Sequence, residues 1–361
     1  MIKGNKGEWS ELYVLLRLLA DGKLYAADET LRKMESVYFP ILSVFRQEFE
    51  AGKIEYKVDE KHKSVELYYN GDKIKALPAS QLKGYAEKFL GGIVSRRDKK
   101  LAFYLDGADE IMQDIHCTKI KAPSSDKTDI QVKIHDIMTG HQSVVGYSIK
   151  SDLGMPPTLL NPGKTTNFRF TVSGISDIDA VEINNINTSS KLIDRFNRIK
   201  ELGGADCVQF DCVNHPVFAG NLLMIDTNMD RICADMLIEY FFNRKNSCAD
   251  IATAIEEKDI LGYGREGLYR YKIKKLLYAV ALGMRPATPW DGQDEANGGY
   301  IIVKESGDVV AFHLYNRNEF EKYLFNNTRL DTSSSSRYDY GSLYKVNGKM
   351  CINLNLQIRF C

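Results

Sequence analysis

The stretch Lys127-Thr-Asp-Ile-Gln-Val-Lys-Ile-His135, followed closely by Gly146-Tyr-Ser-Ile-Lys-Ser151, decides the fold prediction for this chain. Each half alternates polar and apolar residues at period two, which is typical of a strand with one buried face. The connection between them contains Asp136, Gly140 and other turn formers. The two halves therefore predict a β-hairpin that carries Asp129 near the start of one strand and Lys150 near the end of the next.

An Asp and a Lys on neighbouring strands suit metal-dependent phosphodiester hydrolysis. Mg²⁺ is held by one or two carboxylates together with the substrate phosphate. The ion lowers the pKa of a bound water and neutralises the charge that develops on the phosphorane. A Lys beside that water orients it or stabilises the pentavalent oxygens. We expect Asp129 to bind the metal and Lys150 to position the nucleophile, an arrangement that resembles the PD-(D/E)xK nucleases.

One position departs from that pattern, because the residue two before the Lys is Ser148 where an acid is usual. A hydroxyl holds a water but supplies no charge to a divalent ion, so a second carboxylate is expected elsewhere. The segment 8–20 predicts an amphipathic helix, since its apolar residues recur at i, i+3, i+4 and i+7 (Leu12, Leu15, Leu16 and Leu19). Glu11 lies beside that apolar stripe and is the candidate for a catalytic or metal-binding carboxylate. Glu8 equally suits a helix N-terminal acid.

Three further segments resemble the HpaII family of type II restriction endonucleases, and they span the chain from its first residues to its last. They are Gly4-Asn-Lys-Gly-Glu-Trp-Ser-Glu-Leu-Tyr13, Ser151-Asp-Leu-Gly-Met-Pro-Pro-Thr-Leu-Leu-Asn161 with Thr165-Thr-Asn-Phe168, and Leu354-Asn-Leu-Gln-Ile-Arg-Phe360. The resemblance implies a Mg²⁺-dependent enzyme that cuts double-stranded DNA at CCGG, paired in its host with a methyltransferase for the same site. It also implies that the site falls on Asp129, Ser148 and Lys150, with Ser148 as a family feature. Because a palindrome presents two equivalent phosphates, we expect a symmetric homodimer.

Composition is compatible with this function. The 361 residues are 44% apolar, and 48 Lys and Arg balance 48 Asp and Glu. Zero net charge does not argue against DNA binding, because local clustering of charge matters more than the total. The absence of a long apolar run or a signal-peptide pattern predicts a soluble cytoplasmic protein. Seven irregularly spaced Cys favour reduced thiols over a zinc site at Cys207, Cys212 and His215.

The predicted fold class is α/β or α+β, with a PD-(D/E)xK core of mixed sheet flanked by helices. Residues 1–175 are expected to form the nuclease core with the catalytic hairpin. Residues 176–361 are expected to form a helical and β-rich part that completes the core and contacts DNA. Further helices are predicted over 31–46, 80–91, 181–201, 221–243, 247–258 and 267–283, a hairpin turning at 70–72, and strands over 300–303, 309–314 and 350–360.

Polar residues outside the hairpin are candidates for contacts with DNA. Arg commonly reads guanine in the major groove, which favours Arg169 and Arg337 in loop-like settings. Backbone contacts beside the cut are expected from Asn161, Lys164, Thr165 and Asn167, with turn chemistry as the alternative for the two Asn. The loop Gly262-Tyr-Gly-Arg-Glu-Gly267 matches a dinucleotide fingerprint but lacks a βαβ frame, and holding a DNA phosphate is its other interpretation.

Two other functions fit the same residues. A catalytically silent DNA-binding protein on this fold would explain Ser148 in place of an acid. A repair or recombination nuclease would cut according to DNA structure and not sequence.

Overall fold

The computed structural model describes residues 2–49, 52–121, 128–137, 140–204, 206–313 and 316–361. Lys127 of the hairpin stretch, residues 138–139 of its turn and Leu314 at the end of a predicted strand lie outside the described residues. The chain divides into two compact units. The first comprises residues 1–157 and 294–320, and the second comprises residues 158–293 and 321–361.

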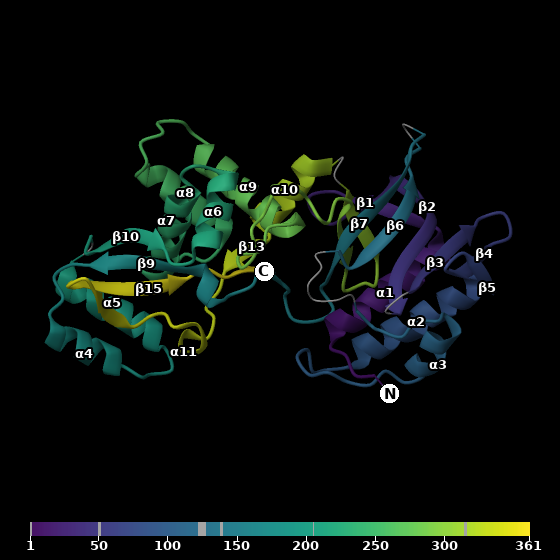
Figure 1. Ribbon diagram of the computed structural model, residues 1–361, viewed down its shortest axis with the longest axis horizontal. Helices are drawn as coiled ribbons and strands as arrows, with labels where there is room; N and C mark the ends of the chain where they lie inside the picture. Colours follow the sequence, from purple (N-terminus) through teal and green to yellow (C-terminus); the bar gives the residue numbers. More distant parts are fainter. Residues whose placement is uncertain (1, 50–51, 122–127, 138–139, 205, 314–315) are drawn as a thin grey trace. The chain divides into compact units, whose positions relative to one another are not determined.

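The first unit is built on a mixed nine-stranded sheet of order β1-β12-β11-β7-β6-β2-β3-β4-β5, counted over the described residues (Figure 1). The β1–β12 and β7–β11 pairs are parallel, and the other neighbours are antiparallel. The strands are β1 (Lys23–Ala27), β2 (Lys33–Phe49), β3 (Gly52–Asp59), β4 (Ser64–Tyr69), β5 (Asp72–Pro78), β6 (Ile130–His135), β7 (Gln142–Ser151), β11 (Gly299–Val303) and β12 (Val309–His313). Its helices are α1 (Lys6–Asp21), α2 (Ala79–Ser95) and α3 (Ala108–Asp114).

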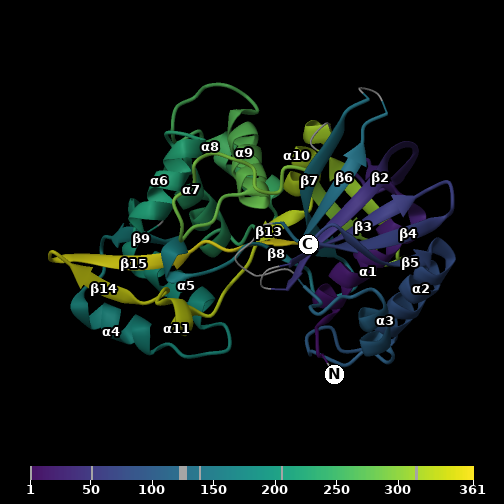
Figure 2. The ribbon, with the colours of Figure 1, turned by 45° about the vertical axis from the view of Figure 1, so that its right-hand side comes forward.

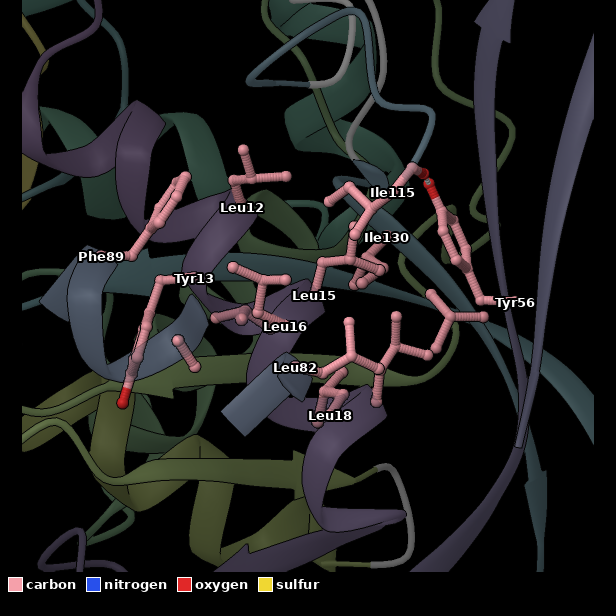
Figure 3. Close-up of a cluster of buried hydrophobic side chains, with 14 of the residues drawn as sticks. Leu12, Tyr13, Leu15, Leu16, Leu18, Tyr56, Leu82, Phe89, Ile115 and Ile130 are labelled. Atoms are coloured by element: carbon pink, nitrogen blue, oxygen red, sulfur yellow. Dashed lines mark hydrogen bonds between the residues drawn. The ribbon is translucent and has the colours of Figure 1, made fainter. Parts of the chain in front are cut away.

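One face of this sheet forms the hydrophobic core with α1, α2 and α3. Leu12, Leu15 and Leu16 of α1 are fully buried and belong to the same hydrophobic cluster as Ile130 of β6 and Tyr56 of β3 (Figure 3). The apolar stripe of the N-terminal helix is therefore explained by burial against the sheet, where each Leu contributes about 2–5 kcal/mol relative to Ala. The helix begins in a capping box between Asn5 and Glu8 and ends at Gly22 in the left-handed conformation.

The opposite face of the sheet carries different side chains. Successive residues of a strand point to opposite faces, so the positions between the core residues of β6 and β7 share this face. They include Gln131, Lys133, Ser148 and Lys150. At the β11–β12 end the face is covered by Phe320 of α10 (Arg317–Asn326), whose ring lies 5.0 Å from Tyr300 and 5.5 Å from Phe312.

The second unit combines two small sheets with a group of helices (Figure 2). One sheet has the order β10-β9-β15-β14 and the other the order β13-β16-β8. The strands are β8 (Thr158–Leu160), β9 (Asn167–Val172), β10 (Val208–Val213), β13 (Thr328–Leu330), β14 (Leu343–Val346), β15 (Lys349–Asn355) and β16 (Ile358–Phe360). The helices are η1 (Lys164–Thr166), α4 (Asp177–Asn185), α5 (Lys191–Gly203), α6 (Pro216–Ile225), α7 (Met229–Phe241), α8 (Cys248–Lys258), α9 (Leu268–Leu282) and α11 (Ser335–Tyr338).

The mixed sheet with flanking helices is as predicted, and several details differ. The division between the units falls at residue 157 and not near 175, and residues 294–320 return to the first unit. They do so because β11 pairs with β7 and β12 pairs with β1. The helix predicted over 31–46 is wrong, since this segment belongs mainly to β2.

Two long predicted helices are each divided in two. Residues 181–201 contain parts of α4 and α5, and residues 221–243 contain parts of α6 and α7. No helix among the described residues is both long enough and apolar enough to cross a lipid bilayer. The seven Cys are all free thiols.

Candidate active site

The predicted hairpin is present as β6 and β7, and it brings Asp129 directly beside Ser148. Ile130 pairs with Tyr147 in the antiparallel register, so Asp129, one residue earlier, lies opposite Ser148. The backbone N–H of Asp129 donates to the carbonyl of Tyr147 over 2.9 Å, which extends the ladder by one bond. Asp129 is half-buried at the end of the strand pair, where a carboxylate is held by a rigid platform and still reaches solvent.

Two donors fix the orientation of the Asp129 carboxylate. The Ser148 hydroxyl donates to Oδ2 over 3.0 Å, and the backbone N–H of Ile149 donates to the same oxygen over 2.6 Å. Ser148 is only 4% exposed, so its hydroxyl is available mainly to this carboxylate. Ser148 thus positions Asp129 and supplies no second negative charge.

Lys150 lies on the same sheet face as Ser148, because the two are separated by two residues on β7. Its Nζ lies 5.4 Å from the centroid of the Tyr300 ring. Tyr300 pairs with Ser148 in the parallel β7–β11 register and is 2% exposed. A cation over an aromatic face is attracted by the ring quadrupole, so Tyr300 restricts where the ammonium group lies. We call Asp129, Ser148 and Lys150 the Asp129 cluster.

Glu11 is half-buried on α1, the helix that packs against the other face of the sheet. Its negative charge contributes to the raised pKa of Lys121, although the hydrogen bond from Lys121 to Glu8 is the main cause. The role of Glu11 as a second carboxylate stays a prediction. Glu8 has the alternative role foreseen for it, since it accepts the N–H of Asn5 in the capping box.

The donor set at the Asp129 cluster fits a hard divalent cation. Oδ1 of Asp129 accepts no hydrogen bond from any described residue, whereas Oδ2 is engaged by two donors. Mg²⁺ is commonly bound by one or two carboxylates with water and phosphate oxygens completing the shell, so one free carboxylate oxygen is sufficient for a protein anchor. Over the described residues, no group of three or more His, Cys, Asp and Glu side chains is arranged to hold a metal.

The residues predicted to contact DNA all belong to the second unit. The segment after β8 lies against the segment around α11, far away in the sequence. Lys164 forms an ion pair with Asp339, and the side-chain amide of Asn167 donates to the carbonyl of Tyr338 over 2.7 Å. Arg337 directly precedes Tyr338 in the sequence, is exposed, and has its guanidinium 5.5 Å from the Tyr338 ring.

The candidate DNA contacts differ in their exposure and in whether their polar groups already have partners within the protein. Asn167 is 3% exposed at the start of β9 and accepts the Asn355 amide over 2.7 Å, so it holds distant segments together and is not a turn residue, as its alternative interpretation had it. Arg169 donates to Asp211 over 2.5 Å, and this hydrogen bond raises the pKa of the guanidinium. Asn161 is exposed and Thr165 is half-buried.

Backbone N–H groups of the glycine-rich loop 262–267 donate to two acids that precede the loop in the chain, Asp259 and Glu256. The N–H groups of Tyr263 and Gly264 donate to the Asp259 carboxylate over 2.9 and 2.8 Å. The N–H of Gly267 donates to Glu256. These backbone donors are therefore satisfied within the chain, and the interpretation of the loop as a phosphate cradle is not supported.

Tyr300 is the residue near the Asp129 cluster that the sequence prediction missed. The strand 300–303 was predicted, but its neighbour in the sheet was not, because parallel pairing between distant segments leaves no local signal. Alternation alone would have placed Tyr300 and Ile302 on one face. It does not say which strand lies next to β11.

The chain is similar to known restriction enzymes over nearly its whole length. The model of the HpaII restriction endonuclease family matches residues 5–360. Type II restriction enzyme HpaII from Haemophilus parainfluenzae is 39% identical over 362 aligned residues, covering 99% of this chain and 98% of that enzyme. No solved structure matches the chain. A match over nearly the whole length, with the Asp129 cluster assembled on paired strands, shows that the chain belongs to the HpaII family of type II restriction endonucleases, which are site-specific deoxyribonucleases.

Proposed function

We propose that this protein makes double-strand cuts in DNA at the palindrome CCGG by Mg²⁺-dependent phosphodiester hydrolysis at the Asp129 cluster, on a PD-(D/E)xK core. The observation that carries the proposal is the geometry of Asp129. Its Oδ2 is fixed by Ser148 and Ile149, its Oδ1 accepts no hydrogen bond from the described residues, and Lys150 lies on the same face of the sheet. The target sequence follows from the resemblance to the HpaII family.

The chain contributes two charges of opposite sign to the reaction. Asp129 would hold the metal ion, which when bound lowers the pKa of water and neutralises phosphate charge. The ammonium group of Lys150 would orient the attacking water and stabilise the negative charge on the equatorial oxygens of the transition state. Because Ser148 and the Ile149 N–H are already in place, the carboxylate needs little reorganisation when substrate binds.

A single strong carboxylate is sufficient in this proposal. Ser148 donates to Asp129 and so replaces the acid of related sites by an orienting group. Glu11 is retained as the proposed source of a second carboxylate, and the two possibilities make different predictions. A Glu11→Gln variant should lose most of its Mg²⁺-dependent rate only if Glu11 binds metal. It should keep that rate if Asp129 acts alone.

The proposed partners follow from the substrate. A palindrome has two equivalent cutting positions, which favours a homodimer with one Asp129 cluster per strand. A restriction enzyme that cuts CCGG in the cytoplasm would also destroy host DNA. A methyltransferase acting on the same sequence is therefore part of the proposal. The DNA contacts proposed for the second unit are Arg337, Lys164, Arg169, Asn161 and Thr165, of which exposed Arg337 is the best placed. Lys164 and Arg169 would exchange their ion pairs with Asp339 and Asp211 for DNA phosphates.

The test is cleavage of plasmid DNA of known sequence by the purified protein with Mg²⁺, followed by sequencing of the ends. Discrete fragments that all end within CCGG support the proposal. Discrete fragments at another sequence would overturn the target and keep the activity. Cutting that depends on mismatches or branches would favour a repair nuclease. A specific gel shift without cleavage under any divalent ion would favour the catalytically silent binder.

A further inference from the structure

The polar face of the sheet extends from the Asp129 cluster across β6, β2 and β3. Gln131 and Lys133 of β6 lie opposite Phe45 and Ser43 of β2, and these pair in turn with residues 55 and 57 of β3. All these positions alternate with core residues such as Val44 and Val132. They therefore share the face that carries Asp129 and Lys150. Lys53, Lys57 and Gln131 are exposed on it.

Lys53 is held in a defined place on this face. Its Nζ donates to Oε1 of Gln131 over 3.1 Å and lies 4.4 Å from the centroid of the Phe45 ring. The side chain therefore crosses β2 and reaches β6. Both contacts leave the ammonium with hydrogen-bonding capacity, because an ammonium group has three N–H donors.

No acid in the part of the chain that the structure describes neutralises the charge of Lys53. Among the described residues no carboxylate forms an ion pair with Lys53. The two acids nearby on this face are engaged elsewhere. Glu55 accepts the Ser43 hydroxyl over 2.6 Å, and Glu66 accepts hydrogen bonds from Tyr68 and Lys73. A fixed, unpaired ammonium at the surface is complementary to an anion.

The Lys53 ammonium lies within a few nucleotides of DNA backbone from Asp129. Its partner Gln131 follows Asp129 by two residues on the same sheet face, which corresponds to about 7 Å along the strand direction. One strand of B-DNA presents a phosphate about every 3.4 Å of helix axis, so about 7 Å spans about two phosphate steps. When one phosphate lies at Asp129, a phosphate one or two nucleotides away in the same strand falls within reach of the Lys53 ammonium.

We infer that Lys53, held by Gln131 and Phe45, binds a backbone phosphate one or two nucleotides from the one that is cut. The inference rests on the proposed function and adds a contact to the DNA backbone outside the Asp129 cluster. Lys53 would not take part in the chemical step. Its loss should therefore weaken DNA binding and leave the rate at saturating DNA nearly unchanged.

Lys57 provides a matched control on the same strand. It is exposed on the same face and lies 5.8 Å from the ring of Tyr68. It is four residues further from the end of the sheet that carries Asp129, and it pairs in register with Glu66. The two substitutions Lys53→Met and Lys57→Met each remove one charge and keep the apolar stem. Only the first should remove a phosphate contact.

The experiment measures binding of a CCGG duplex without divalent ions as a function of salt, together with the single-turnover cleavage rate at saturating DNA with Mg²⁺. We expect Lys53→Met to reduce the slope of log affinity against log salt by about 0.9. The affinity should fall by about threefold to tenfold. Lys57→Met should keep the wild-type slope, and both variants should cut within about twofold of the wild-type rate.

The outcomes separate this inference from the proposed function. A wild-type protein that neither binds nor cuts CCGG overturns both. A wild-type protein that does both, with an unchanged slope in Lys53→Met, overturns the inference alone. Equal losses of affinity and of salt slope in Lys53→Met and Lys57→Met would show that binding depends on the total positive charge of this face. That result would also overturn the inference about Lys53. A Gln131→Leu variant should give a smaller loss than Lys53→Met, because it frees the ammonium without removing it.

Discussion

At the scale of single residues, we expect Tyr300 to position Lys150. Its ring lies 5.4 Å from the Lys150 Nζ and is fixed by Phe320 at 5.0 Å. A cation–π contact contributes about 0.5–2 kcal/mol. Tyr300→Leu should therefore slow single-turnover cleavage by about 2- to 30-fold, whereas Tyr300→Phe should keep the rate within about twofold.

The pH profile of the cleavage rate separates positioning from a packing defect. If Tyr300 acts through Lys150, Tyr300→Leu shifts the profile and Tyr300→Phe restores it. If Tyr300 is only part of the core, the melting temperature of the Leu variant falls and its pH profile stays that of the wild type. Equal rates and equal profiles for both variants would contradict the positioning role.

Asp235 of α7 is a residue whose protonation should affect stability. Burial raises its pKa from 3.8 to about 6, with Glu239 adding to the shift and Lys258 opposing it. Its Oδ2 has no hydrogen-bond partner among the described residues. Because the folded-state pKa is the higher one, ionisation destabilises the fold. The penalty is absent below about pH 4, grows between the ordinary and the raised pKa, and is complete above about pH 6.

Asp235→Asn should consequently raise the melting temperature at pH 7.5 and have little effect near pH 4. We expect a gain of about 1–2 kcal/mol at pH 7.5, since one unit of pKa shift is about 1.4 kcal/mol and the side chain keeps some solvent access. Thermal unfolding of both proteins between pH 4 and pH 7.5 measures this gain in stability. The control is Glu257→Gln, which replaces an exposed acid on α8 and should leave the melting temperature unchanged at both pH values. A pH-independent effect of Asp235→Asn would contradict the assignment.

At the scale of elements, α1 supports the hairpin that carries the site. The Ser10 hydroxyl lies 2.8 Å from that of Ser151, the last residue of β7. The helix starts in a capping box in which the Glu8 N–H donates to the Asn5 side chain over 3.0 Å and the Asn5 N–H donates to Glu8 over 2.9 Å. The box satisfies two backbone donors that a helix start otherwise leaves open.

Asn5→Ala should lower the free energy of unfolding by about 1 kcal/mol, because the cap is lost. The double variant Asn5→Ala/Glu8→Ala should be less destabilised than the sum of the single variants, since the two bonds belong to one motif. Urea unfolding of the four proteins measures this coupling. Strict additivity would show that the capping box does not act as a unit.

Elements with a strong local pattern were predictable from the sequence. The α1 stripe and the β6–β7 hairpin are both confirmed, because burial of one face imposes a period on the sequence. The segment 31–46 was misassigned, since Ile41, Val44 and Phe45 repeat at helical spacing. Its Val, Tyr and Phe content instead suits β2, which pairs with β1, β3 and β6 along its length.

At the scale of the whole molecule, the return of the chain to its first sheet could not be predicted. β11 and β12 come after the 136 residues from 158 to 293 and then add to the sheet beside β7. Such pairing depends on contacts between distant segments and leaves no local signal. For the same reason the sequence indicated Asp129 and Lys150 on one hairpin, but not Tyr300 or Lys53, whose positions depend on neighbouring strands.

The central claim is that Asp129 binds the metal ion that cutting requires. The most direct measurement is the single-turnover cleavage rate of a CCGG duplex with Mg²⁺ for Asp129→Asn, beside Asp72→Asn, an exposed acid at the start of β5. Binding without divalent ions is measured on the same proteins. The account predicts a rate loss on the order of 10³-fold for Asp129→Asn with binding retained, and no loss for Asp72→Asn. Cleavage by Asp129→Asn at a rate close to that of the wild type would contradict it.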